Sequence, residues 1–344
     1  MGTVSRRGAA VALATAVLGL ILSACGGGTA GSAPSITLYN GQHIQTTTAL
    51  VAAFETQTGI HVNVRSNDED VFANQIVQEG ARSPADVIYT ENSPALEYLQ
   101  ERGLLAAVDP STLARVPSQD DSPQGDWVGV TARVSVLIYN TTLLKPDQLP
   151  TSVMQLADPR WAGKLALAPG ETDFQPIVTS IVKSHGRSAA LAWLQAVKTN
   201  AGAHVYPDNE TVTEMVNRGQ AAIGIINHYY WYRARYELGA ASLHSAIAYF
   251  SPRDPGYVVD VSGAAVLKSS HDKQDAQRFL AFIVSRKGQE IIAHSHSYEY
   301  PLGSGVTSAM GLRPFASLQP SPISVGQLGD GSAAIALLQK VQLL

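Results

Sequence analysis

The chain has 344 residues, of which 45% are hydrophobic and 15% charged, and its formal net charge is −4. This composition is typical of a folded globular protein and excludes a largely disordered one, and the length suffices for two domains. The excess of acidic over basic residues also disfavours nucleic acid as a partner, because a nucleic-acid-binding face is rich in Lys and Arg.

The start of the chain predicts a signal peptide and not a part of the fold. Two arginines precede an apolar stretch, residues 9–22, that is too short to span a bilayer comfortably. Leu-Ser-Ala then precedes Cys25, the single cysteine of the sequence, and this ending resembles the lipobox of bacterial lipoproteins. We expect residues 1–24 to be removed, Cys25 to be lipidated, and residues 25–34 to form a flexible tether.

This processing has consequences for charge and location. It would remove two of the 24 basic residues and none of the 28 acidic ones, so the mature chain would carry a formal charge of −6. With Cys25 lipidated, no disulfide, cysteine nucleophile or cysteine metal site is available. The protein is expected outside the cytoplasmic membrane and anchored by its lipid, either in the periplasm or on the outer face of that membrane.

Strands and helices alternate through the rest of the sequence. The first part predicts strands at 35–40, 61–65 and 85–89 and helices at 46–58, 72–80 and 94–102. After a polar stretch at 116–125, strands are predicted at 128–139, 164–168, 221–226 and 258–266, and helices at 174–185, 189–198, 209–219 and 272–284. The alternation predicts an α/β protein of two lobes with mainly parallel sheets. The approximate lobes are 35–127 with 260–305, and 128–259 with 306–344.

Polar side chains follow several of these strands, where ligands bind in open parallel sheets. The residues at these strand ends are His43, Glu91, the stretch Glu171, Thr172 and Asp173, and the adjacent pair Tyr229 and Tyr230. Each has an ordinary structural explanation, such as a turn, a helix N-terminus or aromatic packing. Their shared position instead favours one common site.

The adjacent tyrosines indicate which cation such a site would hold. A phenol has a pKa of about 10, and only a strongly Lewis-acidic cation would deprotonate two of them near neutral pH. Two phenolates and a carboxylate carry three negative charges, which balance a ferric ion and overcharge a divalent one. Zinc would favour His and Cys, which are scarce at these positions.

At these residues the sequence resembles the ferric-ion-binding, substrate-binding proteins of bacterial ABC transporters, which are transferrin-like. The resemblance is carried, in the family's order, by YNGQH (39–43), RSPADVIYTE (82–91), NHYYW (227–231), SGAAVLKSS (262–270) and EYPL (299–302). It implies a two-lobed periplasmic binding protein fold of the class II type, with the ligand cleft between the lobes.

The resemblance also implies roles for individual residues. Iron would be held by His43, Glu91, Tyr229 and Tyr230. An exogenous anion, often phosphate or carbonate in the family, would fill the remaining coordination sites. The positions that match the family's anion-binding residues are Thr172, Asn209 and Asn227.

One segment departs from the family's pattern. Many members have Ser-Gly-Ala at the start of the helix predicted at 174–185, where backbone N–H groups cradle the anion. This sequence has Glu171, Thr172 and Asp173 there, and two carboxylates would repel phosphate. We expect Thr172 and Asp173 to cap the helix. The alternatives are that the loop points elsewhere, or that one carboxylate replaces the anion as a ligand.

A second group of histidines stands near the C-terminal end of the resemblance. Alternation would place His294, His296 and Tyr298 on one face of a strand, as a minor metal site. We expect this stretch to be a solvated segment instead, and we predict no second metal.

The resemblance implies a monomeric, extracytoplasmic protein that captures Fe³⁺ and hands it to the membrane permease of an ABC transporter. The same fold could instead bind an organic anion, a polyamine or a sugar, with the aromatic side chains stacking on it. An enzyme is not expected, because the sequence has no GxSxG, HExxH or Walker A motif.

Overall fold

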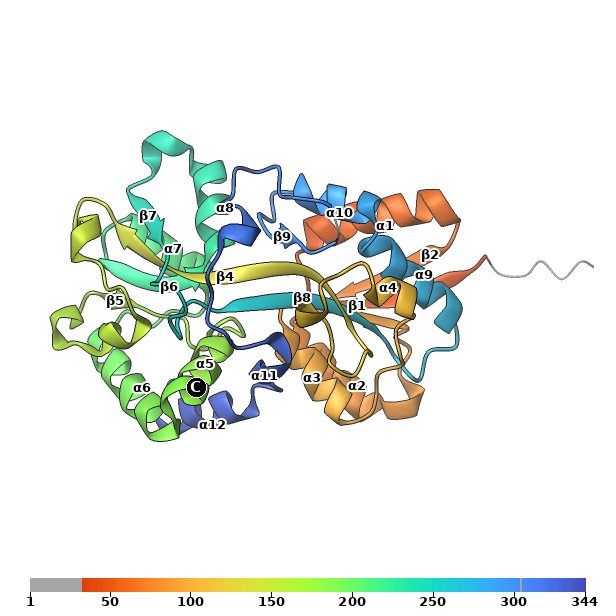
Figure 1. Cartoon of the computed structure of the whole chain (residues 1–344), viewed down its shortest axis with the longest axis horizontal. Helices are drawn as coiled ribbons and strands as arrows, with labels where there is room; N and C mark the ends of the chain where they lie inside the picture. Colours follow the sequence, from red (N-terminus) through yellow and green to blue (C-terminus); the bar gives the residue numbers. More distant parts are fainter. Residues whose placement is uncertain (1–32, 304) are drawn as a thin grey trace, which may run out of the picture. The chain divides into compact units, whose positions relative to one another are not determined.

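The structure is a computed structural model that describes residues 33–303 and 305–344 (Figure 1). The predicted signal peptide, the lipidation of Cys25 and nearly all of the predicted tether therefore lie outside the described residues. Within the described residues, no helix is both long enough and apolar enough to cross a membrane.

The first group of elements is built on three parallel strands. β1 (Ser35–Asn40) pairs with both β2 (His61–Ser66) and β3 (Val87–Tyr89), and the helices that follow these strands are α1 (Ile44–Thr58), α2 (Glu69–Glu79) and α3 (Ser93–Glu101). Leu50 and Phe54 bury one face of α1, and the helix ends at Gly59, whose φ of 71° suits glycine. All six predicted elements are confirmed to within three residues.

A second group of elements surrounds a second parallel pair. β5 (Leu165–Ala166) pairs with β6 (Ile223–Asn227), and the helices are α5 (Phe174–His185), α6 (Arg187–Ala201), α7 (Asn209–Asn217) and α8 (His228–Leu238). The prediction for α5 is confirmed at both ends. Helix α8 was not expected from the sequence, because His, Tyr and Trp form helices only moderately well and Asn227 makes no side-chain cap bond.

Two long strands connect the groups, and they correct the prediction of mainly parallel sheets. β4 (Val128–Asn140) runs antiparallel to β8 (Val259–Val266), to β6, to β7 (Ser245–Ala248) and to β9 (Tyr300–Pro301), and β8 runs antiparallel to β3. The sheet order is β2-β1-β3-β8-β4-β6-β5, so the sheet is mixed. Alternation of strand and helix does not give the direction of a strand such as β8, which returns from far along the chain.

The remaining helices cover the ends of this arrangement. They are α4 (Pro110–Leu113), α9 (Lys273–Ile283), α10 (Arg286–Ala293), α11 (Val325–Leu328) and α12 (Ser332–Lys340). Helix α9 confirms the prediction at 272–284. The segment 294–298 follows the end of α10 as a turn, so the strand considered for His294 and His296 is wrong.

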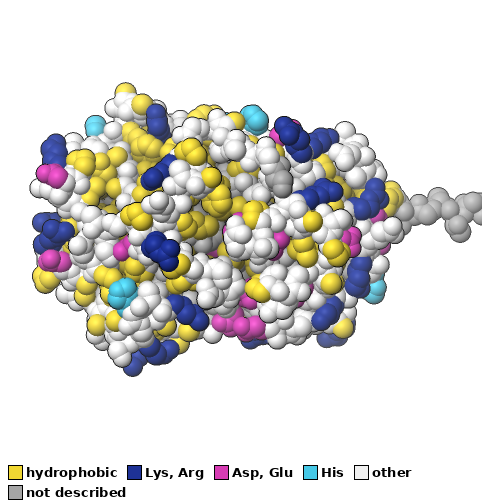
Figure 2. Space-filling view, viewed as in Figure 1, with side chains coloured by type: hydrophobic (Ala, Val, Ile, Leu, Met, Phe, Trp, Pro, Cys, Tyr) yellow, Lys and Arg dark blue, Asp and Glu magenta, His cyan; other side chains and the backbone are white. Residues whose placement is uncertain are grey.

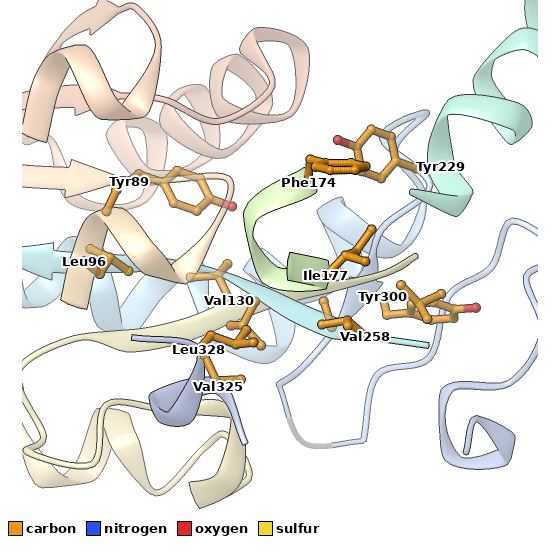
Figure 3. Packing of buried hydrophobic residues seen from close by; sticks show 14 of the residues in the cluster. Tyr89, Leu96, Val130, Phe174, Ile177, Tyr229, Val258, Tyr300, Val325 and Leu328 are labelled. Atoms are coloured by element: carbon orange, nitrogen blue, oxygen red, sulfur yellow. The ribbon is translucent and has the colours of Figure 1, made fainter. Parts of the chain in front are cut away.

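The hydrophobic core runs along the two long strands. Every residue of β4 is buried, and one cluster of buried side chains extends from the first group to the second. Figure 3 shows part of it, with Val130 of β4 near the middle and Val325 and Leu328 of α11 beneath. Helix α11 contacts α3, α5 and β8. Both groups therefore share one continuous core.

The surface carries charges of both signs. On the face shown in Figure 2, Lys and Arg side chains are interspersed with Asp and Glu, and no continuous basic band is seen there. The expected absence of a nucleic-acid partner stays a prediction.

Substituting Gly129 with Ala is expected to destabilise the fold by about 1–3 kcal/mol. An added Cβ on Gly129 would lie 2.1 Å from the backbone oxygen of Asp120 and 3.0 Å from Cγ1 of Val261. Urea unfolding measures the loss. Gly170→Ala is the control, because its Cβ would meet only Cδ2 of Leu344, at 3.9 Å, and a change within about 0.5 kcal/mol is expected. Equal stability of both variants would contradict the packing at β4.

Candidate metal centre

The four predicted metal ligands come from strand ends that the fold brings together. Because β1 and β3 are parallel, His43 and Glu91 follow them at the same edge, and Nδ1 of His43 lies 3.3 Å from Oε1 of Glu91. Tyr229 and Tyr230 lie in the first turn of α8, directly after β6. The His43 ring packs edge-on against Tyr229, with ring centroids 5.1 Å apart. Side chains of the two groups therefore meet at one place.

The two tyrosine hydroxyls converge on a single carboxylate oxygen. Their rings lie 4.2 Å apart, and both side chains are buried. The hydroxyls of Tyr229 and Tyr230 donate to Oδ2 of Asp173 at 3.2 and 3.0 Å, and Nδ2 of Asn209 donates to the same atom at 3.3 Å. The other oxygen of Asp173, Oδ1, is buried without a hydrogen-bond partner in the described part of the chain.

This geometry corrects the expectation that Thr172 and Asp173 cap α5. Asp173 makes no side-chain cap bond and already has helical backbone angles, while Oγ1 of Thr172 accepts a hydrogen bond of 3.0 Å from Asn92. The Asp173 carboxylate accepts hydrogen bonds from the hydroxyls of Tyr229 and Tyr230 instead of from the backbone N–H groups at the start of α5. The alternative in which a carboxylate takes the place of the anion stays a prediction.

The three residues predicted to bind an anion have different surroundings. Asn209, at the start of α7, contacts Asp173 and so belongs to the site. Thr172 lies beside it but bonds to Asn92 of the first group. Asn227 is buried at the end of β6, immediately before α8. An anion at Asn209 would compete with the Asp173 carboxylate for the same donor.

The electrostatics of the site keep the phenols neutral when no metal is bound. Burial, and secondly the Asp173 carboxylate, raise the pKa of Tyr229 and of Tyr230 well above 10, which agrees with both hydroxyls acting as donors. Desolvation raises the pKa of Glu91 to about 8. Burial lowers the pKa of His43 to about 4, so its imidazole is neutral, the form that binds metals.

Helix α8 adds a further electrostatic contribution. Tyr229 and Tyr230 occupy its first turn, where the free backbone N–H groups and the helix dipole favour negative charge. A phenolate formed there is stabilised relative to one in the middle of a helix. The helix start therefore favours the deprotonated form that a metal requires.

Other histidines near these elements have structural surroundings. Nδ1 of His228 accepts a 3.3 Å hydrogen bond from the backbone of Val134, and its ring stacks on Tyr300 at 4.8 Å. The ring of His296 stacks on Tyr236 at 3.9 Å. Among residues 33–303 and 305–344, no three His, Cys, Asp or Glu side chains form a group that could hold a metal.

Two buried charged residues behind His43 and Glu91 were missed as functional candidates by the sequence reasoning. Arg133, on β4, forms an ion pair with Glu299, and both side chains are fully buried. The guanidinium also donates to the backbone oxygen of Glu91. A charged residue inside the otherwise uncharged run VGVTARVSVLIYN was the available signal, since a buried Arg requires a partner.

Comparisons with known proteins show the family of the chain. Residues 82–313 match the family model described as bacterial extracellular solute-binding protein. The chain is 39% identical to the Fe(3+)-binding periplasmic protein of Serratia marcescens, over 94% of this chain and 95% of that protein. It is 37% identical to the major ferric iron-binding protein of Neisseria meningitidis, over 89% and 92%.

Solved structures extend the likeness to the fold. Iron-bound HitA from Pseudomonas aeruginosa has a TM-score of 0.85 and 42% identity, covering 90% of this chain and 99% of that one. A Trichodesmium protein in complex with iron and citrate ligands has a TM-score of 0.79 and 30% identity, over 89% and 99%. The chain therefore belongs to the bacterial extracellular solute-binding protein family, in its group of two-lobed, ferric-ion-binding periplasmic proteins.

Proposed function

We propose that this protein is the extracytoplasmic ferric-iron-binding component of an ABC transporter. The observation that carries the proposal is the convergence of two buried, adjacent tyrosine hydroxyls on one carboxylate. Fe³⁺ would displace both phenol protons and bind Tyr229, Tyr230 and Asp173 on one side of the cleft. His43 and Glu91 would complete the coordination from the other side. The names of the ferric-binding relatives support this cargo.

The charge of the proposed ligand set bears on the question of the anion. Two phenolates, Glu91 and Asp173 carry four negative charges, one more than Fe³⁺ neutralises. A phosphate or carbonate would add further negative charge beside Asp173, at the donor that Asn209 already gives to this carboxylate. We therefore propose that Asp173 takes over the role that an exogenous anion has in the family.

Iron would be captured in the cleft between two lobes. We retain 35–127 with 260–305 as the first lobe, and 128–259 with 306–344 as the second. Iron would bind the tyrosine side first, and closure would then bring up His43 and Glu91. Because the ion contacts both lobes only in the closed form, it stabilises that form.

A permease would recognise the closed form and receive the iron from it. A lipid on Cys25 would hold the monomeric protein beside the membrane. The family consists of solute-binding proteins, and no catalytic role is proposed.

The alternative cargoes fit the site less well. An organic anion would face the carboxylates of Glu91 and Asp173, with Glu171 nearby at the cleft. A sugar or a polyamine would not require two adjacent phenols that share one carboxylate. The ferric-binding relatives also do not favour these ligands.

A visible spectrum tests the proposed function. Ferric citrate is titrated at neutral pH into residues 26–344, the mature chain without its lipidated cysteine. Phenolate-to-iron charge transfer is expected to produce a broad visible band that saturates at one iron per chain. A chain that stays colourless would not bind iron through its tyrosines, and the organic-ligand alternative would then come first.

Iron affinity is expected to fall steeply as the pH falls. Both phenols have a raised pKa in the metal-free site, and the pKa of Glu91 is raised to about 8, so all three groups must release a proton when iron binds near neutral pH. Three protons released per iron lower the apparent affinity by about 1,000-fold for each pH unit of acidification. Calorimetric titration in buffers of different ionisation enthalpy counts the protons directly. Binding without proton release would show that the phenols are not ligands.

A further inference from the structure

A single buried arginine holds two segments of the first lobe from behind the metal site. The side chain of Arg133 is 0% exposed, on the strand β4 that connects the two groups of elements. Its Nη2 forms an ion pair with Oε1 of Glu299. Its Nη1 donates to the backbone oxygen of Glu91 and lies 3.3 Å from Oδ1 of Asn92. The planar guanidinium thus fixes the Glu91 loop and Glu299 together.

The Glu299 carboxylate extends this arrangement to His43. Nε2 of Gln42 donates to Oγ of Ser262 at 2.7 Å and to Oε1 of Glu299 at 3.5 Å, which orients the amide. Oε1 of Gln42 then accepts from the backbone N–H of His43 at 2.7 Å and contacts Nδ1 of its ring. Oε2 of Glu299 lies 3.9 Å from the same Nδ1. With Nδ1 as the donor, Nε2 carries the lone pair that a metal would use.

The guanidinium also faces the tyrosine side of the site. Cζ of Arg133 lies 5.6 Å from the ring centroid of Tyr229. Burial alone would raise the pKa of Glu299, but Arg133 beside it holds that pKa below its ordinary value. Both partners are therefore charged, and the pair is neutral as a whole. The Arg133–Glu299 pair therefore orients the neighbouring groups without changing the net charge around the ion.

We propose that Arg133 is a positioning residue for iron, which holds His43 and Glu91 in place relative to the tyrosines and is not itself a ligand. It acts on Glu91 directly and on His43 through Glu299 and Gln42. Because β4 pairs with both β8 and β6, the two first-lobe ligands are held against a strand that also contacts the tyrosine side of the site. This inference rests on the proposed binding of ferric iron.

The test is Arg133→Lys, which keeps the positive charge but loses the fork that reaches two partners at once. Iron affinity, measured by competition with citrate, is expected to fall about 10–100-fold, as for other residues that orient metal ligands. At saturating iron, the band position and the ratio of one iron per chain should stay unchanged, because the phenolates come from the other lobe. Arg218→Lys is the control, since Arg218 is exposed and pairs with Glu214 at the surface.

A double-mutant cycle separates positioning from a general effect on the fold. In a chain that carries His43→Ala and Glu91→Ala, adding Arg133→Lys should change the remaining iron affinity by less than about twofold, because the residues it positions are gone. A full 10–100-fold loss in that background would overturn the inference, as would a wild-type affinity for Arg133→Lys alone.

Two further measurements distinguish a failure of the positioning role from a folding defect and from a failure of the proposed function. If Arg133→Lys does not fold, the pair Arg133→Gln with Glu299→Gln removes both charges together and leaves neither buried alone. The same loss of affinity is expected of it, and wild-type affinity in the folded pair variant would overturn the inference. A wild-type chain that binds no iron would instead refute the proposed function.

Discussion

Replacing Tyr229 and Tyr230 together with Phe is expected to abolish the visible band and to lower ferric-iron affinity by more than roughly 1,000-fold. The change removes two anionic donors, so its effect should exceed the 10–100-fold that follows from disturbing an orienting residue. The rings remain, so the packing against His43 and between the two tyrosines is retained. Absorbance and citrate competition measure both effects on the same sample.

A matched control for this variant lies in the same helix. Tyr232 of α8 stacks on Tyr298 at 5.7 Å, outside the group of hydroxyls that meet at Asp173. Tyr232→Phe should keep the band and the affinity of the wild-type protein. If the Tyr229 and Tyr230 double variant stayed coloured and bound iron with unchanged affinity, the assignment of the ligands would be wrong.

Asp173→Ala is expected to lower iron affinity at least about 100-fold in buffer free of phosphate and carbonate, as the loss of a direct ligand should exceed the loss of an orienting one. Added phosphate or carbonate should then restore part of the lost iron affinity. The substitution vacates a place beside the start of α5, whose backbone N–H groups favour an anion, and frees the Asn209 donor. The wild-type affinity should depend little on either anion, because Asp173 fills that place.

The neighbouring carboxylate supplies the comparison for this prediction. Glu171→Ala removes a carboxyl group two residues away without removing the acceptor of the tyrosine hydroxyls, so iron binding should remain independent of added anion. Affinity is measured with and without phosphate for all three proteins. A wild-type protein that requires phosphate as strongly as the Asp173 variant would show that Asp173 is not a ligand.

The elements of the first lobe show how far local sequence patterns reach. The strands β1 and β3 and the helix α1 have the apolar spacing that their prediction requires, and α1 ends at Gly59. Because parallel strands end at one edge of a sheet, the sequence alone predicts that His43 and Glu91 lie near each other. The chemistry of two adjacent tyrosines, together with the resemblance, likewise led to a ferric site from residue types alone.

The helix α8 and the strand β8 show where that reasoning ends. Aromatic residues with moderate helix propensity form α8 because tertiary packing of Tyr229 and Tyr230 supports it. The antiparallel direction of β8 follows from its pairing with β3 and β4, which are distant in the chain. Neither feature has a local signal, because propensity and periodicity describe neighbours in sequence and not partners in space.

The sequence by itself therefore determined the α/β class, the first-lobe elements and the residue types of the site. Only the tertiary structure decided what Asp173 and Arg133 do. Asp173 meets the hydroxyl of Tyr229 across 56 positions of sequence, and Arg133 meets Glu299 across 166. A buried carboxylate or guanidinium is held by whichever hydrogen-bond partners the fold brings within reach. Those partners are chosen by the packing of the strands and helices, which the order of residues along the chain does not display.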